Sequence, residues 1–381
     1  MTTASASDWR QEGEAKFAIT GAFYRPKSKI ARDLAILAAN LYRLKNGQLR
    51  VLDAMTGCGV RPLRYCLESA ADFVWANEAN PDLHGLIQQN LATLPGARVR
   101  ITHQDARTVC FDCYQNRDFF DLVDIDNFGA PSTYIDAGLW ATRKGGLLYL
   151  TSTDGRSTGG HDPQRSLRSF GAYARSHRAV HEQGLRLLIG QAAQVAAARG
   201  MGIQPVFSLF TGQVHRAMVQ LVPKPTLTEN TYGFIAYCHR CGHFQTVGWK
   251  QLGRVMCPSC HPQDDAFPVV SGPLWIGPLH GEDWVKAMQS LAEQWGWVSQ
   301  TKLLSVMEQE ATLPPYYYSL GAIGHFGAMD IPNRDRLIAA LRQQGHRATP
   351  THVDWQAIKT DASFGECVEI ARTCANPESF P

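Results

Sequence analysis

The segment 51–61, which reads VLDAMTGCGVR, constrains the fold of this chain more than any other. Apolar and β-branched residues lead to a carboxylate at Asp53, a turn with Gly57 and Gly59 follows, and a helical pattern occupies residues 62–71. This order places a turn with few side chains at the carboxyl end of a strand and at the positive end of a helix. Ligands bind at such turns in open α/β sheets, because backbone N–H groups and the helix dipole point outward together. The segment therefore predicts an α/β sheet with a ligand at this turn.

The spacing of the glycines bears on the kind of ligand. A dinucleotide site usually reads G-x-G-x-x-G, whereas here Arg61 and a proline follow Gly59. The acid also precedes the glycines, which resembles the first motif of S-adenosylmethionine-dependent methyltransferases. We assign Asp53, Gly57 and Gly59 to such a cofactor site. The turn alone leaves a dinucleotide fold and plain strand–turn–helix packing open.

Two further acids stand at the ends of the next two predicted strands. Residues 73–78 read as a strand that ends at Glu78, about 25 residues after the first acid, where a ribose-binding carboxylate is expected. A carboxylate can accept hydrogen bonds from two hydroxyl groups at once. Residues 98–102 alternate as a half-buried strand, which places Asp105 to accept from an adenine amine and Ala106 to donate its backbone N–H. Each acid alone could be a helix N-cap, but three acids at successive strand ends favour the cofactor interpretation.

The fourth predicted strand, residues 120–126, leads into the segment that would carry the chemistry. Enzymes that methylate exocyclic amines often have a D/N-P-P-Y/F element here. A purine amine is a poor nucleophile because its lone pair is delocalised, so orientation and electrostatics must lower the barrier. We expect Asp126 to accept from the amine, Phe128 to stack on the base, and Asp124 to support Asp126 or share the proton. The alternative is a strand-to-helix turn with Asp126 as its N-cap, and Asn127 stands where proline is common.

Four of the ten cysteines form two C-x2-C pairs separated by fifteen residues. They are Cys238, Cys241, Cys257 and Cys260. This spacing lets two turns present four thiolates to one tetrahedral ion. We expect a structural zinc ion, since four sulfur ligands leave no position open for water. Cys110 and Cys113 have the spacing of a redox pair, but no redox-fold pattern surrounds them.

The length and the charge distribution suggest two domains and a polyanionic partner. A chain of 381 residues exceeds the usual size of one domain. The net charge of +3 is too small to indicate a nucleic-acid partner by itself. Residues 1–64, however, hold 11 Lys or Arg against 5 Asp or Glu, and residues 151–200 hold 7 Arg against 3 acids. Positive regions beside a catalytic loop suit a polyanionic substrate, although a solvated surface is the alternative.

The order of the predicted elements divides the chain near residue 224. Residues 1–224 hold the predicted sheet, which closes with two strands at 205–210 and 215–222. Residues 225–381 hold the cysteine ribbon, at 236–262, and several amphipathic helices. A basic turn between these helices, Q344-G-H-R347, could bind phosphates. Alternatively, the helices could form a packing or dimerisation domain. The N-terminus lacks the apolar core of a secretory signal, and no stretch approaches the roughly 20 apolar residues of a membrane span. We therefore expect a cytosolic protein without membrane contact.

Several segments together resemble one known family. They are residues 22–26 (AFYRP), 30–34 (IARDL), 52–65, 124–131 (DIDNFGAP), 151–154, the cysteine quartet, 315–318 and 358–361. In combination these segments resemble the tRNA (guanine-N2)-dimethyltransferase family, which acts on guanine 26 of tRNA. The resemblance runs from about residue 20 to residue 362.

This resemblance implies a Rossmann-like class I methyltransferase sheet and a helix-rich C-terminal domain, containing the zinc ribbon, that helps to hold tRNA. It implies transfer of one or two methyl groups to N2 of guanine 26, by direct attack and without a covalent enzyme intermediate. It also implies that S-adenosylmethionine contacts Arg32, Arg61, Glu78, Asp105 and Ala106. The two arginines could pair with the cofactor carboxylate, or they could be surface charges. No protein partner is implied.

The chain departs from the family pattern at Asn127, at residues 56–58 and at Glu78, where aspartate is usual. The first departure could alter the target or the number of methyl groups. An amine methyltransferase of another RNA or DNA base, or an inactive RNA-binding protein with this fold, remain alternatives. The sequence does not decide between mono- and dimethylation, the modification of nucleotide 27, or the oligomeric state.

Overall fold

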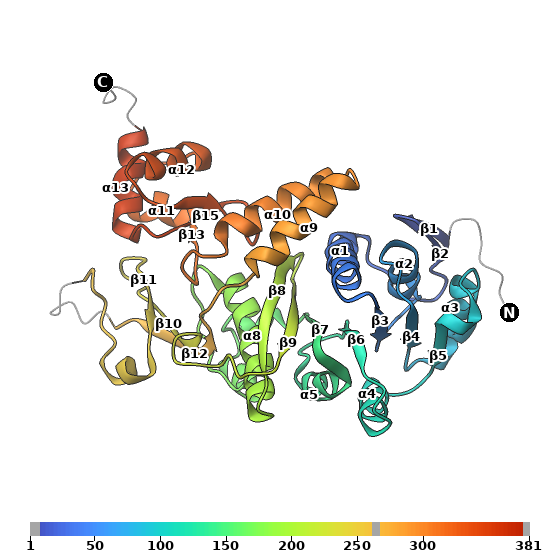
Figure 1. Ribbon diagram of the computed structural model, residues 1–381. Coiled ribbons are helices and arrows are strands. Elements are labelled where there is room, and N and C mark those ends of the chain that lie inside the picture. The colour runs from blue at the N-terminus through green and yellow to red at the C-terminus, as the bar shows by residue number, and fades with distance from the viewer. Residues whose placement is uncertain (1–7, 261–266, 376–381) are drawn as a thin grey trace.

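A seven-stranded sheet forms the centre of the computed structural model, which describes residues 8–260 and 267–375 (Figure 1). Its strand order is β5-β4-β3-β6-β7-β9-β8. The strands are β3 (Arg50–Asp53), β4 (Phe73–Asn77), β5 (Val99–Thr102), β6 (Phe120–Ile125), β7 (Thr142–Ser152), β8 (Gly202–Thr211) and β9 (Val214–Val222). Strands β3 to β7 pair in parallel, whereas β9 runs antiparallel to β7 and β8. The sheet class and the antiparallel pair at its edge confirm the fold predicted from the sequence.

Helices cover both faces of this sheet. They are α1 (Lys29–Asn46), α2 (Val60–Glu68), α3 (His84–Leu91), α4 (Ala106–Gln115), α5 (Ser132–Ala141), α6 (Gly155–Thr158), α7 (Pro163–Phe170) and α8 (Val180–Ala198). Apolar residues of α1, α2 and α3 pack in one core with Leu122 of β6, and those of α4, α5 and α8 pack in another with Val123. Successive residues of β6 thus pack into the cores on opposite faces of the sheet, which is why every residue of this strand is buried.

Glycines set where the helix beside the predicted ligand turn begins. Gly59 adopts φ 82° and is the N-cap of α2, so the helix starts at Val60 and not at residue 62 as the pattern predicted. It ends at Glu68, three residues before the predicted end, and Ala70 follows with φ 51°. A left-handed residue cannot continue a right-handed helix, and the chain passes directly into β4.

The C-terminal part contains two small sheets and five helices in its described residues. One sheet has the order β11-β10-β12, and the other has β13-β15-β14. The elements are β10 (Tyr232–Tyr237), β11 (Phe244–Val247), β12 (Val269–Trp275), α9 (Glu282–Gln294), α10 (Val298–Glu310), β13 (Tyr318–Ser319), α11 (Leu320–Gly327), α12 (Arg334–Gln343), β14 (Ala348–Pro350), β15 (Ala357–Thr360) and α13 (Phe364–Ala375). An N-terminal hairpin, β1 (Trp9–Glu12) and β2 (Ala15–Ala18), and the short 3-10 helices η2 (Pro26–Ser28), η3 (Pro81–Leu83), η4 (Gly96–Arg98) and η5 (Trp249–Arg254) complete the fold.

The C-terminal part packs directly on the sheet domain. Helix α9 lies beside α1 and contacts β8 (Figure 1). Apolar side chains of α9 and α10 belong to the same core as those of α1. On the other side, the Lys359 ammonium of β15 contacts the Glu182 carboxylate of α8 at 2.7 Å, and both are buried. The boundary after residue 224 falls between β9 and β10 and stays a prediction. No helix in the described part of the chain is long and apolar enough to cross a membrane.

Candidate active site

A cavity of about 510 Å³ lies where β3, β4, β5 and β6 end, and the turns after these strands line it. Most of the predicted site residues lie there. They are Arg32, Gly57, Arg61, Glu78, Asp105, Ala106, Asp126 and Phe128. The other three do not line the cavity: Asp53 and Asp124 are fully buried at the ends of their strands, and Gly59 caps α2.

The turn after β3 is held to the turn after β4 through Glu78. The Gly57 N–H donates to Glu78 Oε2 at 2.9 Å, and the Asn80 N–H donates to Oε1 at 3.0 Å. Gly57 has φ 58°, a conformation that glycine adopts without strain. The Glu78 carboxylate is therefore fixed in orientation, and each oxygen keeps a lone pair for a further donor.

Asp105 is the N-cap of α4 and also lines the cavity. Its Oδ1 accepts the Arg107 N–H at 2.8 Å, and Oδ2 lies 2.9 Å from the Arg107 guanidinium. The hydrogen bond from the Arg107 side chain lowers the pKa of Asp105 to about 2. The N-cap alternative left open by the sequence is thus correct for this residue, and it coexists with a place at the cavity wall.

A buried arginine connects the two acids of the fourth strand. Arg61 Nη1 donates to Asp124 Oδ2 at 2.8 Å, and Nη2 donates to Asp126 Oδ2 at 2.6 Å. The Tyr65 hydroxyl also donates to Asp124, at 2.8 Å. Burial alone would raise the pKa of Asp126, but Arg61 and Arg216 hold it below its usual range. Asp126 is therefore a carboxylate at neutral pH.

Arg216 was missed by the sequence reasoning. It lies on β9 and lines the cavity, with Nη2 3.6 Å from Asp126 Oδ1 and 3.2 Å from Ser28 Oγ. Within the described residues, its Nε and Nη1 have no hydrogen-bond partner, and burial lowers its pKa. One signal could have found it, because it is an arginine within the mostly apolar strand predicted at 215–222.

Two exposed phenylalanines line the same cavity. Phe128 is 73% exposed and Phe23 is 69% exposed, and their rings meet edge to face with centroids 5.3 Å apart. Large apolar side chains that stay exposed at a cavity mark a binding surface. Asn127, between Asp126 and Phe128, donates from Nδ2 to the Phe128 carbonyl at 3.0 Å. An amide thus holds this turn where the family pattern has proline.

Arg32 already has an acidic partner from the N-terminal hairpin. Its Nε donates to Glu12 Oε2 at 2.8 Å, and the Tyr24 hydroxyl donates to Oε1 at 2.6 Å. The guanidinium also lies over the Tyr24 ring, 5.3 Å from its centroid. Glu12 gave no signal in the sequence, because it comes from a strand of only four residues.

Comparison with known proteins identifies the family of this chain. The sequence model of the N2,N2-dimethylguanosine tRNA methyltransferase family matches residues 8–372. The chain belongs to this family. The tRNA (guanine(26)-N(2))-dimethyltransferase of Pyrococcus horikoshii is 30% identical over 391 residues, which cover 95% of this chain and 97% of that protein. The enzyme of the same name from Thermococcus kodakarensis is 29% identical over 370 residues, covering 92% and 93%.

One solved structure has the same fold over nearly the whole chain. It is the complex of Trm1 from Pyrococcus horikoshii with S-adenosyl-L-methionine, at a TM-score of 0.82 and 29% sequence identity. The match covers 95% of this chain and 99% of that one. The likeness therefore extends over both the central sheet and the C-terminal part.

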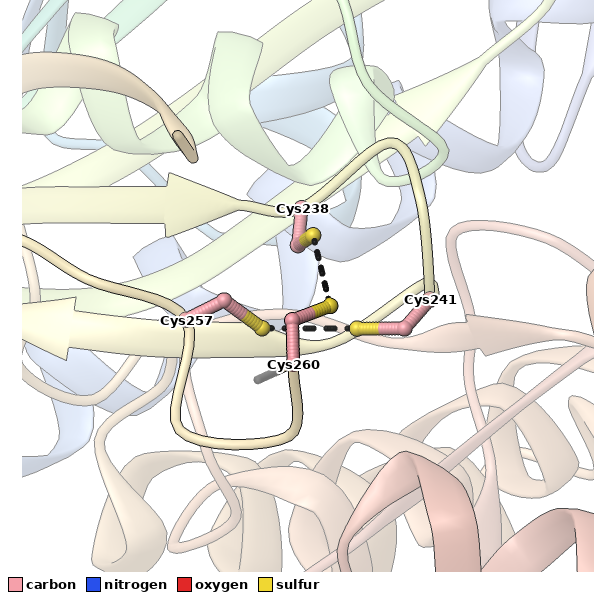
Figure 2. A group of neighbouring side chains, drawn as sticks. All are labelled: Cys238, Cys241, Cys257 and Cys260. Carbon is pink, nitrogen blue, oxygen red and sulfur yellow. Dashed lines mark hydrogen bonds between the residues drawn. The ribbon is translucent and has the colours of Figure 1, made fainter. Parts of the chain in front are cut away.

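The four predicted cysteines converge in this member of the family (Figure 2). Cys238 and Cys241 lie in the turn after β10, and Cys257 and Cys260 lie in the turn before β12. The Sγ atoms are 3.8 Å apart for Cys238 and Cys260, and 3.4 Å apart for Cys241 and Cys257. These distances exclude disulfides, and a tetrahedron with metal–sulfur bonds of about 2.3 Å has edges of about 3.8 Å. Residues 261–262 of the predicted ribbon lie outside the described residues.

The structure also bears on the C-x2-C pair at residues 110–113 and on the basic turn at residues 344–347. Cys110 and Cys113 are buried on α4, and burial raises the pKa of Cys113 to about 12, so neither thiol is poised for redox chemistry. In the basic turn at residues 344–347, Arg347 Nε lies 2.9 Å from Asp361 Oδ2. The positive charge of Arg347, which could bind a phosphate, is therefore partly neutralised by Asp361.

Proposed function

We propose that this protein transfers one or two methyl groups from S-adenosylmethionine to the exocyclic N2 of guanine 26 of tRNA. Membership of the family supports the reaction and its substrate. The observation that carries the proposal for this chain is the position of Asp126. It lies in a cavity with two exposed aromatic rings, and Arg61 and Arg216 keep it ionised. As an enzyme that modifies tRNA, the protein is proposed to act in the cytosol.

The turns at the strand ends fit S-adenosylmethionine, which supplies an electrophilic methyl group on a sulfonium ion. The Glu78 carboxylate is oriented by two backbone N–H groups and would accept from the ribose hydroxyls. Asp105 and the backbone N–H of Ala106 would contact the adenine. The turn around Gly57, with Arg61 beside it, would hold the amino-acid moiety. Arg32 would contribute its remaining N–H groups, because Glu12 occupies part of its guanidinium.

Asp126 would orient the attacking amine. A carboxylate that accepts one N–H of the amine directs the nitrogen lone pair along a fixed line, which reduces the entropy that the reaction must lose. As the new N–C bond formed, the S–CH3 bond of the sulfonium would break and S-adenosylhomocysteine would leave as a neutral thioether. The nitrogen would gain positive charge, which the nearby carboxylate would stabilise. Because the two arginines lower the pKa of Asp126, the carboxylate would stabilise the charge in the transition state, and the proton of the methylated amine would pass to water.

Asp124 would act on Arg61 and not on the base. It is fully buried, it does not line the cavity, and it accepts hydrogen bonds from Arg61 and Tyr65. These contacts hold Arg61 in the rotamer that reaches Asp126. We therefore propose Asp124 as a positioning residue, which revises the expectation that it shares the proton.

Phe128 and Phe23 would hold the guanine base. Both rings line the cavity and are mostly exposed, and every base presents a π-face on which an aromatic ring can stack. An aromatic contact of this kind is largely independent of base identity. Selection of guanine would then depend on the polar groups, with Asp126 accepting from N2.

We also infer a structural zinc ion bound by the four cysteines. Four thiolates in two turns leave no open position for water, and the Sγ distances fit a tetrahedral ion. The ion would join β10 to the turn before β12, within a small sheet that has little core of its own. Its proposed contribution is to folding and not to catalysis.

The direct test is methyl transfer to unmodified tRNA transcripts with labelled S-adenosylmethionine, followed by nucleoside analysis. N2-methylguanosine or N2,N2-dimethylguanosine is expected from a transcript with guanosine at position 26. A transcript with adenosine at that position is expected to remain unlabelled. Equal labelling of the two transcripts would assign the activity to a different nucleotide.

A further inference from the structure

A second cavity, of about 400 Å³, lies beside the first and shares Thr153 with it. Neighbouring residues of a strand point to opposite faces of the sheet. Arg216 of β9 lines the first cavity, and the preceding residue, His215, lines the second. The two cavities therefore lie on either side of the same end of β9. A polymer with one unit in the first cavity could place the adjoining unit in the second.

The second cavity has the lining of an anion site. Arg156 and the histidines His161, His181 and His215 line it, and none of the described residues in its lining is acidic. The Arg156 side chain has no ion-pair partner in the described part of the chain, although Asp154 close by pairs with Arg165. The cavity therefore offers positive charge that the protein itself does not neutralise.

The amino end of α8 opens into this cavity. Val180, which lines the cavity, is the first residue of this 19-residue helix, and no side chain among the described residues caps its N-terminus. Uncapped N–H groups and the helix dipole favour an anion at this position. Glu182 in the first turn does not oppose this, because its carboxylate contacts the cations Arg186 and Lys359 at 2.7 Å each.

His215 lies at the inner end of this cavity, with its ring packed against Gly184 of α8. It is 2% exposed, and neither ring nitrogen has a hydrogen-bond partner among the described residues. Burial lowers its pKa to about 3, so the ring is neutral and still carries one N–H donor. A buried donor without an acceptor is unfavourable. Beside it, Phe210 and His181 stack with ring centroids 4.2 Å apart and form a flat wall.

We propose that this second cavity binds the nucleotide that adjoins guanosine 26 in the tRNA, with its phosphate at the N-terminus of α8 near Arg156. The inference rests on the proposed function, because that function places guanosine 26 in the first cavity. The phosphate would accept from the first N–H groups of α8 and from the Arg156 guanidinium. The wall of Phe210 and His181 would contact the ribose or the base.

The test is a pair of substitutions at one position. Val180→Asp places a negative charge at the phosphate site, whereas Val180→Asn has nearly the same shape without the charge. An acid at the first helical position is favourable for an uncapped helix, so the thermal midpoint of Val180→Asp should not fall. Val298→Asp is a matched control, because Val298 is the first residue of α10, which also has no side-chain cap within the described part of the chain. The dissociation constant for tRNA is measured for each variant over a range of salt concentrations.

The proposal predicts that Val180→Asp binds tRNA about tenfold more weakly than Val180→Asn, with a salt slope smaller by about one. Val298→Asp should bind like the wild type. A neutral methylphosphonate at one of the two linkages that flank guanosine 26 should remove the difference between the Val180 variants. Equal affinities and slopes for these two variants would overturn the proposal. A wild type that binds tRNA without methylating it would refute the proposed function, and the affinity comparison would still decide this inference.

Discussion

Removing the ring of Phe128 tests how the first cavity holds its substrate. The ring is 73% exposed and meets Phe23 edge to face, so it contributes little to folding. An aromatic side chain has about 200 Å² of surface, of which about 150 Å² is then open to a ligand. A base that covers half of this area gains about 2 kcal/mol at 25 cal/mol/Å². This value lies within the range of about 1–3 kcal/mol measured for stacking of one base.

The expected result for Phe128→Ala is a kcat/KM for tRNA that is about thirtyfold lower, since 1.4 kcal/mol corresponds to a factor of ten. Phe128→Tyr should keep most of the activity, because it keeps the π-face. The affinity for S-adenosylmethionine and the thermal midpoint should not change in either variant. An unchanged kcat/KM for Phe128→Ala would refute the stacking role. A large fall in the thermal midpoint would show that the ring is part of the core.

Three other predictions concern the catalytic acid, the cysteines and one buried histidine. Asp126→Asn should lower the single-turnover rate by about 10²–10³ while cofactor affinity stays within a few-fold, and a rate near that of the wild type would contradict its role. Metal analysis should find about one zinc ion per chain, and Cys257→Ala should lose the ion and melt at a lower temperature; unchanged metal content would contradict the site. Burial lowers the pKa of His280 to about 4, so the unfolded chain, with a pKa of about 6.5 for histidine, binds the proton first as the pH falls. The stability that neutral His280 contributes above pH 6.5 should therefore be lost towards pH 4. Between about pH 7.5 and pH 5.5, the free energy of unfolding, measured with denaturant, should fall by about 1 kcal/mol less for His280→Asn than for the wild type. An equal fall in the two proteins would contradict the assignment.

The sequence predicted those parts of the site that directly follow the parallel strands. Each parallel strand ends at the same edge of the sheet, so acids such as Glu78 and Asp126 could be placed together from strand ends alone. The depth of each acid could not be predicted in this way. Asp53 and Asp124 have the same side chain as Asp126, but they are fully buried below the cavity.

The missed residues come from segments far away in the sequence. Arg216 reaches Asp126 from β9, which joins the sheet in antiparallel pairing, and Glu12 reaches Arg32 from the N-terminal hairpin. Such contacts depend on tertiary packing, which a local pattern does not encode. The close contact of α9 with α1 was missed for the same reason, because the amphipathic pattern of a helix shows that it packs but not against what.

The most direct test of the central claim replaces guanosine 26 of a tRNA transcript by inosine, which lacks only the exocyclic N2 amine. If Asp126 orients that amine for methylation, the inosine transcript should bind with similar affinity, since stacking and phosphate contacts remain. It should accept no methyl group at position 26 under conditions in which the guanosine transcript is fully modified. Methylation of the inosine-containing nucleotide would show that the enzyme attacks another atom, and would contradict the role assigned to Asp126.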